Sequence, residues 1–167
     1  PTGGGKSLCY QLPALLFDGV TIVISPLIAL MKDQVDGLLA NEIQATFINS
    51  SLSYSEINVR RRSLSNNKIK ILYIAPERLV MPEFLQFLQR LKVSLFAIDE
   101  SHCISEWGHD FRPEYRQLNI LKEKFPGVPV MALTATATPI VQKDIISQLK
   151  LSGCRIFKAS FNRKNLY

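Results

Sequence analysis

The sequence predicts an α/β fold in which a mostly parallel central sheet is flanked by helices on both faces. Short apolar runs recur along the chain and alternate with longer segments of helical periodicity, as in parallel sheets with crossover helices. The runs are apolar almost throughout, which is typical of strands buried on both faces. Hydrophobic residues make up 47% of the 167 residues, enough for a sizeable core at about the length of one domain.

The first half of the chain alternates regularly. A helix is expected directly after the glycine-rich start, although Pro13 should kink or locally break it. The β-branched run VTIVIS is the first expected strand, and leucines at helical spacing follow it. In order, the expected elements are strand 20–25, helix 27–39, strand 45–49, a polar surface helix 55–66 and strand 69–75.

The second half continues the alternation. The run VSLFAI ends in two acidic residues, and the pair Thr138-Pro139 is a favourable helix start, with a hydroxyl cap before proline. Residues 154–160 (CRIFKAS) are expected to close the series as a last strand. The expected elements before it are helix 77–91, strand 93–98, helix 113–124, strand 128–134 and a helix from 138 through Leu149.

Charge and cysteine usage narrow the class of protein. The net charge of +6 favours a polyanionic partner, although such an excess is also common in ordinary proteins. The three cysteines, Cys9, Cys103 and Cys154, form no C-x-x-C pair, so neither a disulfide framework nor a zinc site is expected. The longest apolar run, 20–31, is shorter than the about 20 residues of a membrane helix, and no membrane partner is expected.

The start of the chain, PTGGGKS, matches the second half of a phosphate-binding loop. The first glycine of that pattern would precede Pro1, and the strand that normally leads into the loop is missing, so we expect an N-terminally truncated domain. Glycines let backbone N–H groups turn toward phosphates, lysine reaches the β- and γ-phosphates, and serine binds Mg²⁺. The residues expected to bind ATP are Thr2, Gly3, Gly4, Gly5, Lys6 and Ser7; the alternative is an ordinary glycine-rich loop.

Asp99 and Glu100 end an apolar strand, which would place their carboxylates beside the phosphate loop. Asp99 is expected to hold Mg²⁺ together with Ser7. Glu100 is expected to orient or deprotonate the attacking water. Two solvated acids at a strand end are the alternative.

Five segments together resemble the first RecA-like motor domain of RecQ-family DNA helicases, a P-loop NTPase fold of the DExH group in superfamily two. The stretch DESHCISEWGHDFRPEYRQL is the most specific of them. It combines a tryptophan-glycine-histidine and a phenylalanine-arginine-proline that other DExH families lack. The segments are PTGGGKS, SPLIALMKDQV (25–35), YIAPERL (73–79), the 99–118 stretch and LTATAT (133–138).

The resemblance implies a role for each matching position. Lys6, Glu100 and His102 match catalytic residues, with His102 linking the nucleotide site to DNA-dependent activation. Residues 105–112 match an aromatic-rich loop that senses single-stranded DNA. The positions implied in DNA binding or coupling are Ser25, Pro26, Leu27, Arg78, Trp107, His109, Phe111, Arg112, Thr134 and Thr136.

Several of these residues have simpler interpretations. Trp107 and Phe111 can stack on bases, but either can instead plug the core beneath its loop. His102 can be a structural histidine, and a metal pair with Cys103 is disfavoured because further ligands at suitable spacing are lacking. The run 60–62 of three arginines suggests a DNA patch, but a solvated helix face is favoured.

The resemblance implies an ATP- and Mg²⁺-dependent 3′-to-5′ DNA helicase that acts on single-stranded and partly duplex DNA in repair or recombination. Residues 1–159 are expected to form the ATP-binding domain, and 160–167 to lead into a missing second RecA-like domain. This stretch alone should therefore hydrolyse ATP poorly and not unwind DNA. An RNA-directed DExH ATPase and a nucleotide-dependent binding module remain alternatives. The expected location is cytoplasmic, at a bacterial nucleoid, or nuclear in a eukaryote.

Overall fold

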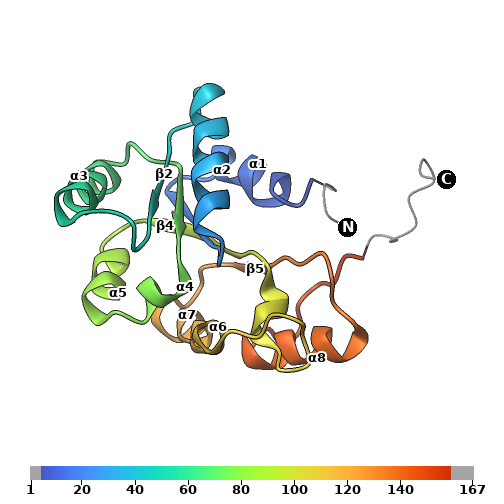
Figure 1. Ribbon diagram of the computed structural model, residues 1–167. Helices are drawn as coiled ribbons and strands as arrows, with labels where there is room; N and C mark the ends of the chain where they lie inside the picture. The colour runs from blue at the N-terminus through green and yellow to red at the C-terminus, as the bar shows by residue number, and fades with distance from the viewer. Residues whose placement is uncertain (1–4, 159–167) are drawn as a thin grey trace.

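The computed structural model describes residues 5–158, so Thr2, Gly3 and Gly4 of the predicted phosphate loop and the predicted connection 160–167 lie outside the described residues. The described chain forms a five-stranded sheet of order β2-β3-β1-β4-β5 in which every pairing is parallel (Figure 1). This confirms the predicted fold class. The strands are β1 (Val20–Ile24), β2 (Ala45–Ile48), β3 (Ile71–Ile74), β4 (Val93–Ile98) and β5 (Val130–Ala132).

The sheet carries a separate apolar core on each face, because successive strand residues point to opposite sides. In β1, Val23 packs into one core, while Ile22 and Ile24 pack into the other. Helices α1 (Leu8–Leu16) and α2 (Ile28–Ala40) cover the first face. The second face is covered by α3 (Tyr54–Ser65), α5 (Pro82–Gln89), α7 (Ile120–Lys124) and α8 (Pro139–Gln148).

Two helices begin at caps that their sequence encodes. Ser53 and Glu56 form a capping box at the start of α3, in which each side chain bonds the other residue's backbone N–H. Thr138 Oγ1 accepts a hydrogen bond from Val141 N at 3.4 Å, and Pro139 fills the first helical position as predicted. Within residues 5–158, no helix combines the length and hydropathy that a bilayer-spanning segment needs.

Four expected elements, three helices and one strand, differ in the structure. Helix α1 runs through Pro13 without a break. The expected helix 77–91 is two helices, α4 (Pro76–Leu79) and α5, because Pro82 starts a new helix. The expected helix 113–124 divides into α6 (Pro113–Arg116), a 3₁₀ turn and α7.

The strand expected over 154–160 is wrong for its described part, since residues 154–158 form no regular secondary structure. A strand needs a hydrogen-bonded neighbour, and the sheet ends at β5. Ile156 and Phe157 are instead exposed.

Candidate active site

Helix α1 brings the described end of the predicted phosphate loop to the carboxyl edge of the sheet. A short turn, 17–19, joins the end of α1 to the start of β1, so the helix runs antiparallel to the strand beside it. Gly5 has a φ of +74°, a left-handed conformation that favours glycine. Ser7 caps α1 without a side-chain hydrogen bond to the helix, which leaves its hydroxyl oxygen available as a ligand.

Asp99 lies at the same edge, directly after β4. Its backbone N–H donates to Ile24 O at 2.9 Å, and Tyr115 donates its hydroxyl to Asp99 O at 3.1 Å. Burial raises the pKa of the Asp99 carboxyl, while the hydrogen bond from Glu100 N and the positive charge of Lys6 act in the opposite direction. The charge of Lys6 therefore acts on the Asp99 carboxylate, and both residues stay predicted site residues.

Glu100 turns sharply away from β4. Its φ of 46° and ψ of 42° lie in the left-handed region, which is uncommon for a residue other than glycine. Strained backbone of this kind is concentrated at functional sites. The turn directs the Glu100 carboxylate toward His102, whose Nδ1 lies 3.2 Å from Glu100 Oε2.

His102 connects Glu100 to the segment after β5. Its Nδ1 also lies 3.0 Å from Thr134 Oγ1. Burial lowers the pKa of His102, and the neighbouring His109 lowers it further, so the ring is neutral near pH 7. Because the ring is neutral, its contact with the Glu100 carboxylate is not an ion pair, and the hydrogen bond of Nδ1 is the one with Thr134 Oγ1. We call residues 99–102 the catalytic corner.

Residues 105–112, which we call the aromatic loop, follow directly. The His109 ring stacks on the His102 ring at 4.4 Å between centroids and 18° between planes. Trp107 is 76% exposed, so the interpretation of this residue as a core plug is wrong. Phe111 is half-buried, with the Arg116 guanidinium 5.1 Å from its ring centroid.

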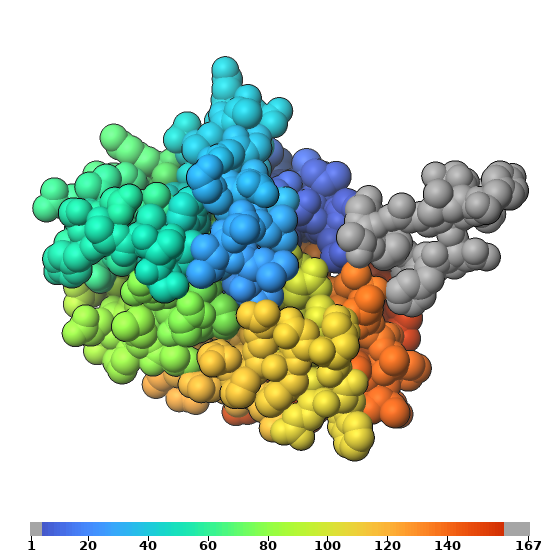
Figure 2. All heavy atoms as spheres, viewed as in Figure 1, coloured from blue at the N-terminus to red at the C-terminus, as the bar shows by residue number. Residues whose placement is uncertain are grey.

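Arg112 fixes the end of the aromatic loop against the turn after β1. Its Nη2 donates to Asp110 Oδ2 at 3.1 Å, and its Nη1 lies 3.5 Å from Pro26 O. The hydrogen bond that Arg112 donates to the Asp110 carboxylate raises the pKa of Arg112. In Figure 2, the surface of α2 (blue) meets that of the segment that contains the aromatic loop (yellow).

A cavity of about 260 Å³ lies where the catalytic corner, the aromatic loop and two further loops meet. It brings together predicted catalytic residues and residues predicted to contact DNA. Its lining comprises Pro26, Leu27, Glu100, His102, His109, Asp110, Ala135 and Thr136.

Two predicted DNA-binding residues have other partners. The Ser25 side chain is buried, and its Oγ accepts from Leu27 N at 3.4 Å, so it shapes the turn after β1. Arg78 lies on α4 and donates from Nη2 to Asn49 O at 2.9 Å, which ties it to the end of β2. Neither residue lines the cavity.

Three residues with clear roles in this geometry were not singled out as site residues from the sequence. Tyr115 holds the Asp99 carbonyl, and its position far along the chain gives no signal of this contact. A Cβ at Gly108 would lie 2.6 Å from His102 O, so only glycine lets the aromatic loop approach the catalytic corner. Its position between Trp107 and His109, both predicted to contact DNA, could have identified Gly108 as a site residue from the sequence.

Asp110 is the third such residue. It completes a group with His102 and Cys103 whose ligand atoms lie within 4.8 Å of one another, although the sequence offered no third ligand at suitable spacing. Its carboxylate is already paired with Arg112. Burial raises the pKa of the Cys103 thiol to about 12, so the sulfur is protonated and a poor metal ligand.

Comparison with known proteins identifies related sequences. The family model for DEAD/DEAH box helicases matches residues 1–145. The chain is 53% identical over 165 residues to the ATP-dependent DNA helicase RecQ of Pasteurella multocida, covering 99% of this chain and 26% of that protein. It is 56% identical over 167 residues to the ATP-dependent DNA helicase RecQ of Bacillus subtilis, covering 99% of this chain and 28% of that protein. The chain thus spans about a quarter of the length of these relatives.

Solved structures show the same fold at lower identity. The Pyrococcus furiosus Hef helicase domain aligns with a TM-score of 0.62 and 22% identity, over 90% of this chain and 32% of that chain. The DUF1998 helicase MrfA bound to DNA aligns with a TM-score of 0.67 and 19% identity, over 90% of this chain and 23% of that chain. At this identity the similarity concerns the fold alone.

Proposed function

The chain belongs to the DEAD/DEAH box helicase family, and from this premise we propose that it is the ATP-binding motor domain of a 3′-to-5′ DNA helicase. In this role it couples ATP hydrolysis to movement along single-stranded DNA and to duplex unwinding, in repair or recombination. The observation that carries the proposal is a continuous set of contacts. It runs from Asp99 and Glu100 through His102 to His109 in the exposed aromatic loop.

The donor set at the carboxyl edge fits Mg²⁺ and a nucleotide. Mg²⁺ prefers hard oxygen ligands, and the Ser7 hydroxyl and Asp99 carboxylate supply them. Burial of Asp99 disfavours its charged form, and a cation beside it would offset that cost. Bound Mg²⁺ would neutralise negative charge on the phosphates. Lys6 would bind the β- and γ-phosphates from the start of α1, where the helix dipole also favours anions.

Glu100 is the base that orients or deprotonates the attacking water. Its carboxylate faces the cavity and is held by His102, so its position depends on the His102 ring. The stack of His109 on His102 gives nucleic acid bound at the aromatic loop a physical route to Glu100. This arrangement supports the proposal that ATP hydrolysis rises when DNA binds.

The aromatic loop favours nucleic acid as the partner. An exposed tryptophan can stack on a base, and neighbouring guanidinium groups can meet phosphates. The names of the relatives, ATP-dependent DNA helicases, favour DNA over RNA as the substrate. A second RecA-like domain of the same protein would complete the motor and supply a transition-state arginine, whose contribution in comparable enzymes is about 10³–10⁵ in rate. The protein would act where the cellular DNA lies, in the bacterial cytoplasm or the eukaryotic nucleus.

The test is phosphate release by the full-length protein with no nucleic acid, with single-stranded DNA and with RNA of the same sequence, beside a strand-displacement assay. We expect stimulation by DNA and unwinding that requires ATP. Lys6→Ala should reduce hydrolysis by about 10²–10³, because the ammonium stabilises charge that grows in the transition state.

Other outcomes would point to the alternatives. Equal or greater stimulation by RNA would favour an RNA-directed ATPase. Nucleotide-dependent binding without turnover would favour a binding module, and near wild-type hydrolysis by Lys6→Ala would contradict the phosphate-loop assignment.

A further inference from the structure

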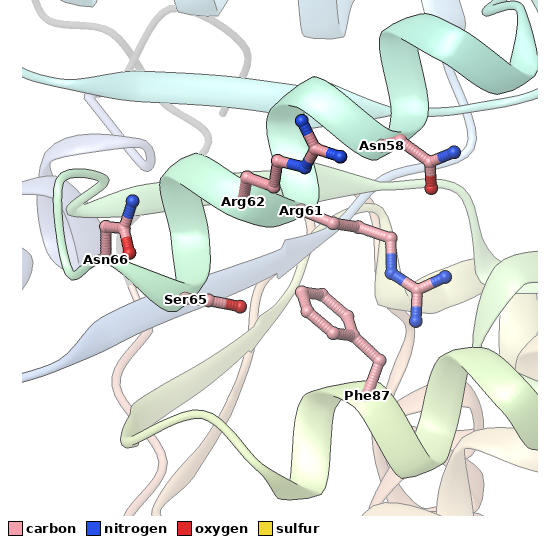
Figure 3. Close-up of a pocket in the computed structure, with 6 residues that line it drawn as sticks. All are labelled: Asn58, Arg61, Arg62, Ser65, Asn66 and Phe87. Carbon is pink, nitrogen blue, oxygen red and sulfur yellow. The ribbon is translucent and has the colours of Figure 1, made fainter.

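A second polar cavity, of about 480 Å³, lies between α3 and α5 (Figure 3). It shares no lining residue with the cavity of the candidate active site. Its lining supplies two guanidinium groups and three uncharged polar side chains around one aromatic ring, and it contains no acidic residue. The lining residues are Asn58, Arg61, Arg62, Ser65, Asn66 and Phe87.

Two of the three arginines in the run 60–62 are not freely solvated as the sequence favours, whereas Arg62 is exposed. Arg60 donates to Phe47 O, with its guanidinium 4.1 Å from the Phe47 ring centroid. The Arg61 guanidinium lies 4.4 Å from the centroid of the Phe87 ring, and Figure 3 shows Phe87 extending from α5 toward it. Stacking of this kind fixes a guanidinium in one orientation while its in-plane N–H groups stay free to donate.

Charge compensation is missing at this cavity. Across residues 5–158, neither Arg61 nor Arg62 forms an ion pair, whereas Arg112 and Arg116 each pair with an acidic residue. Two adjacent cations without a counter-charge favour the binding of an anion. Asn and Ser side chains beside them add donors of the type that accompany arginine at phosphates.

We propose that this cavity, which we call the α3–α5 pocket, binds the phosphodiester backbone of nucleic acid as a second contact site. The proposal goes beyond the function of the carboxyl edge, because α3 ends at residues that lead into the start of β3, at the opposite edge of the sheet. The 12 residues of α3 correspond to about 18 Å, or about five base pairs of duplex. A duplex or strand that leaves the carboxyl edge along α3 therefore reaches the pocket.

The chemistry favours backbone phosphates over bases or a protein segment. Phe87 is only 7% exposed and Arg61 lies against its ring, so no base can stack there. Protein partners usually anchor aromatic or aliphatic side chains in an apolar centre, which this lining lacks. Contacts to phosphates alone make the binding independent of sequence and dependent on salt.

The experiment measures the affinity of the full-length protein for a partial duplex with a 3′ single-stranded tail over a range of salt concentrations. The variants are Arg62→Glu and the double variant Arg61→Glu, Arg62→Glu. Each lost phosphate contact on duplex should reduce the slope of log affinity against log salt by about 0.9, hence by about 1.8 for the double variant. Lys122→Glu, an exposed substitution on α7, is the matched control and should leave the slope unchanged.

One further variant, the single variant Arg62→Glu and a separate assay distinguish loss of the pocket from other causes of a changed slope. The double variant to lysine keeps both charges and should preserve most of the slope, since lysine binds phosphate as a point charge. Arg62→Glu leaves the stack of Arg61 on Phe87 intact, so it tests the pocket even if the double variant unfolds. DNA-stimulated ATP hydrolysis is measured separately: its absence in the wild type would refute the proposed function, while the slopes would still report on the pocket.

Two results would overturn the proposal. One is a slope for folded Arg62→Glu that equals that of the wild type. The other is tighter binding of poly-glutamate than of DNA, lost in the same variant, which would assign the pocket to an acidic protein segment.

Discussion

The catalytic corner and the aromatic loop are neighbours in the chain but are held in opposite ways. The corner is bonded to β1, to the segment after β5 and to α6 through Asp99, His102 and Tyr115. The loop is fixed at one end by Ser105 N, which donates to His102 O, and at the other by Arg112, while Trp107 at its tip is exposed. The difference indicates that the sheet positions the residues proposed to be catalytic, whereas the loop tip is available to a ligand. Predictions that separate the two regions test this division.

The largest expected effect concerns the corner. Glu100→Gln keeps the shape of the side chain but cannot accept a proton, so the rate of ATP hydrolysis should fall by about 10²–10⁴ while ATP binding is retained. The measurements are steady-state phosphate release and nucleotide affinity. Glu123→Gln on α7 is the control and should be neutral. Lost ATP affinity with substantial turnover would instead make Glu100 a structural acid.

Trp107→Ala should act on the loop alone. Loss of one stacked base costs about 1–3 kcal/mol of nucleic-acid contact, so DNA affinity, DNA stimulation and unwinding should fall. Basal hydrolysis and the melting temperature should not change, because the side chain is exposed. Phe17→Ala removes a partly exposed aromatic at the other edge of the sheet and should leave DNA stimulation intact. An unchanged stimulation factor with a lower melting temperature would contradict the proposed role of Trp107.

The same division explains what the sequence could predict. Strands β1 and β4 are buried on both faces over their central residues, so they appear as continuous apolar runs, and Asp99 follows from its place at the end of such a run. Local caps such as Thr138 are likewise encoded within a few residues. By contrast, the bond from Tyr115 to Asp99 O and the left-handed turn at Glu100 depend on contacts between distant segments.

The predictions for residues 154–158 and for residues 60–62 depart from the structure for the same physical reason. Residues 154–158 have strand-like composition, but composition does not show whether a neighbouring strand is present. The run 60–62 looks like a solvated face because the sequence does not show that Phe47 and Phe87 lie beneath two of its guanidinium groups.

Gly108→Ala should disturb both regions at once. The added Cβ would meet His102 O at 2.6 Å, so the loop must move away from the corner. Overpacking of this kind typically costs about 1–3 kcal/mol of stability. We expect a lower melting temperature together with weaker DNA stimulation, measured by thermal unfolding and phosphate release. Gly37→Ala, where no atom lies within 4 Å of an added Cβ, is the matched control. Full retention of both properties would show that the close approach is dispensable.

The smallest expected effect concerns the contact that joins the two regions, the stack of His109 on His102. An aromatic pair contributes about 0.5–1.5 kcal/mol beyond its buried area, so His109→Ala should weaken DNA stimulation several-fold and leave basal hydrolysis near that of the wild type. His109→Phe keeps a flat ring but has no titratable nitrogen. If stacking transmits the signal, the phenylalanine variant should retain most of the stimulation that the alanine variant loses. Because His109 also lowers the pKa of His102, equal losses in both variants would mean that the charge or hydrogen bonding of His109 matters instead of its stacking. Wild-type stimulation in both would mean that the loop and the corner communicate through other contacts, with Arg112 and Pro26 as the next pair to test.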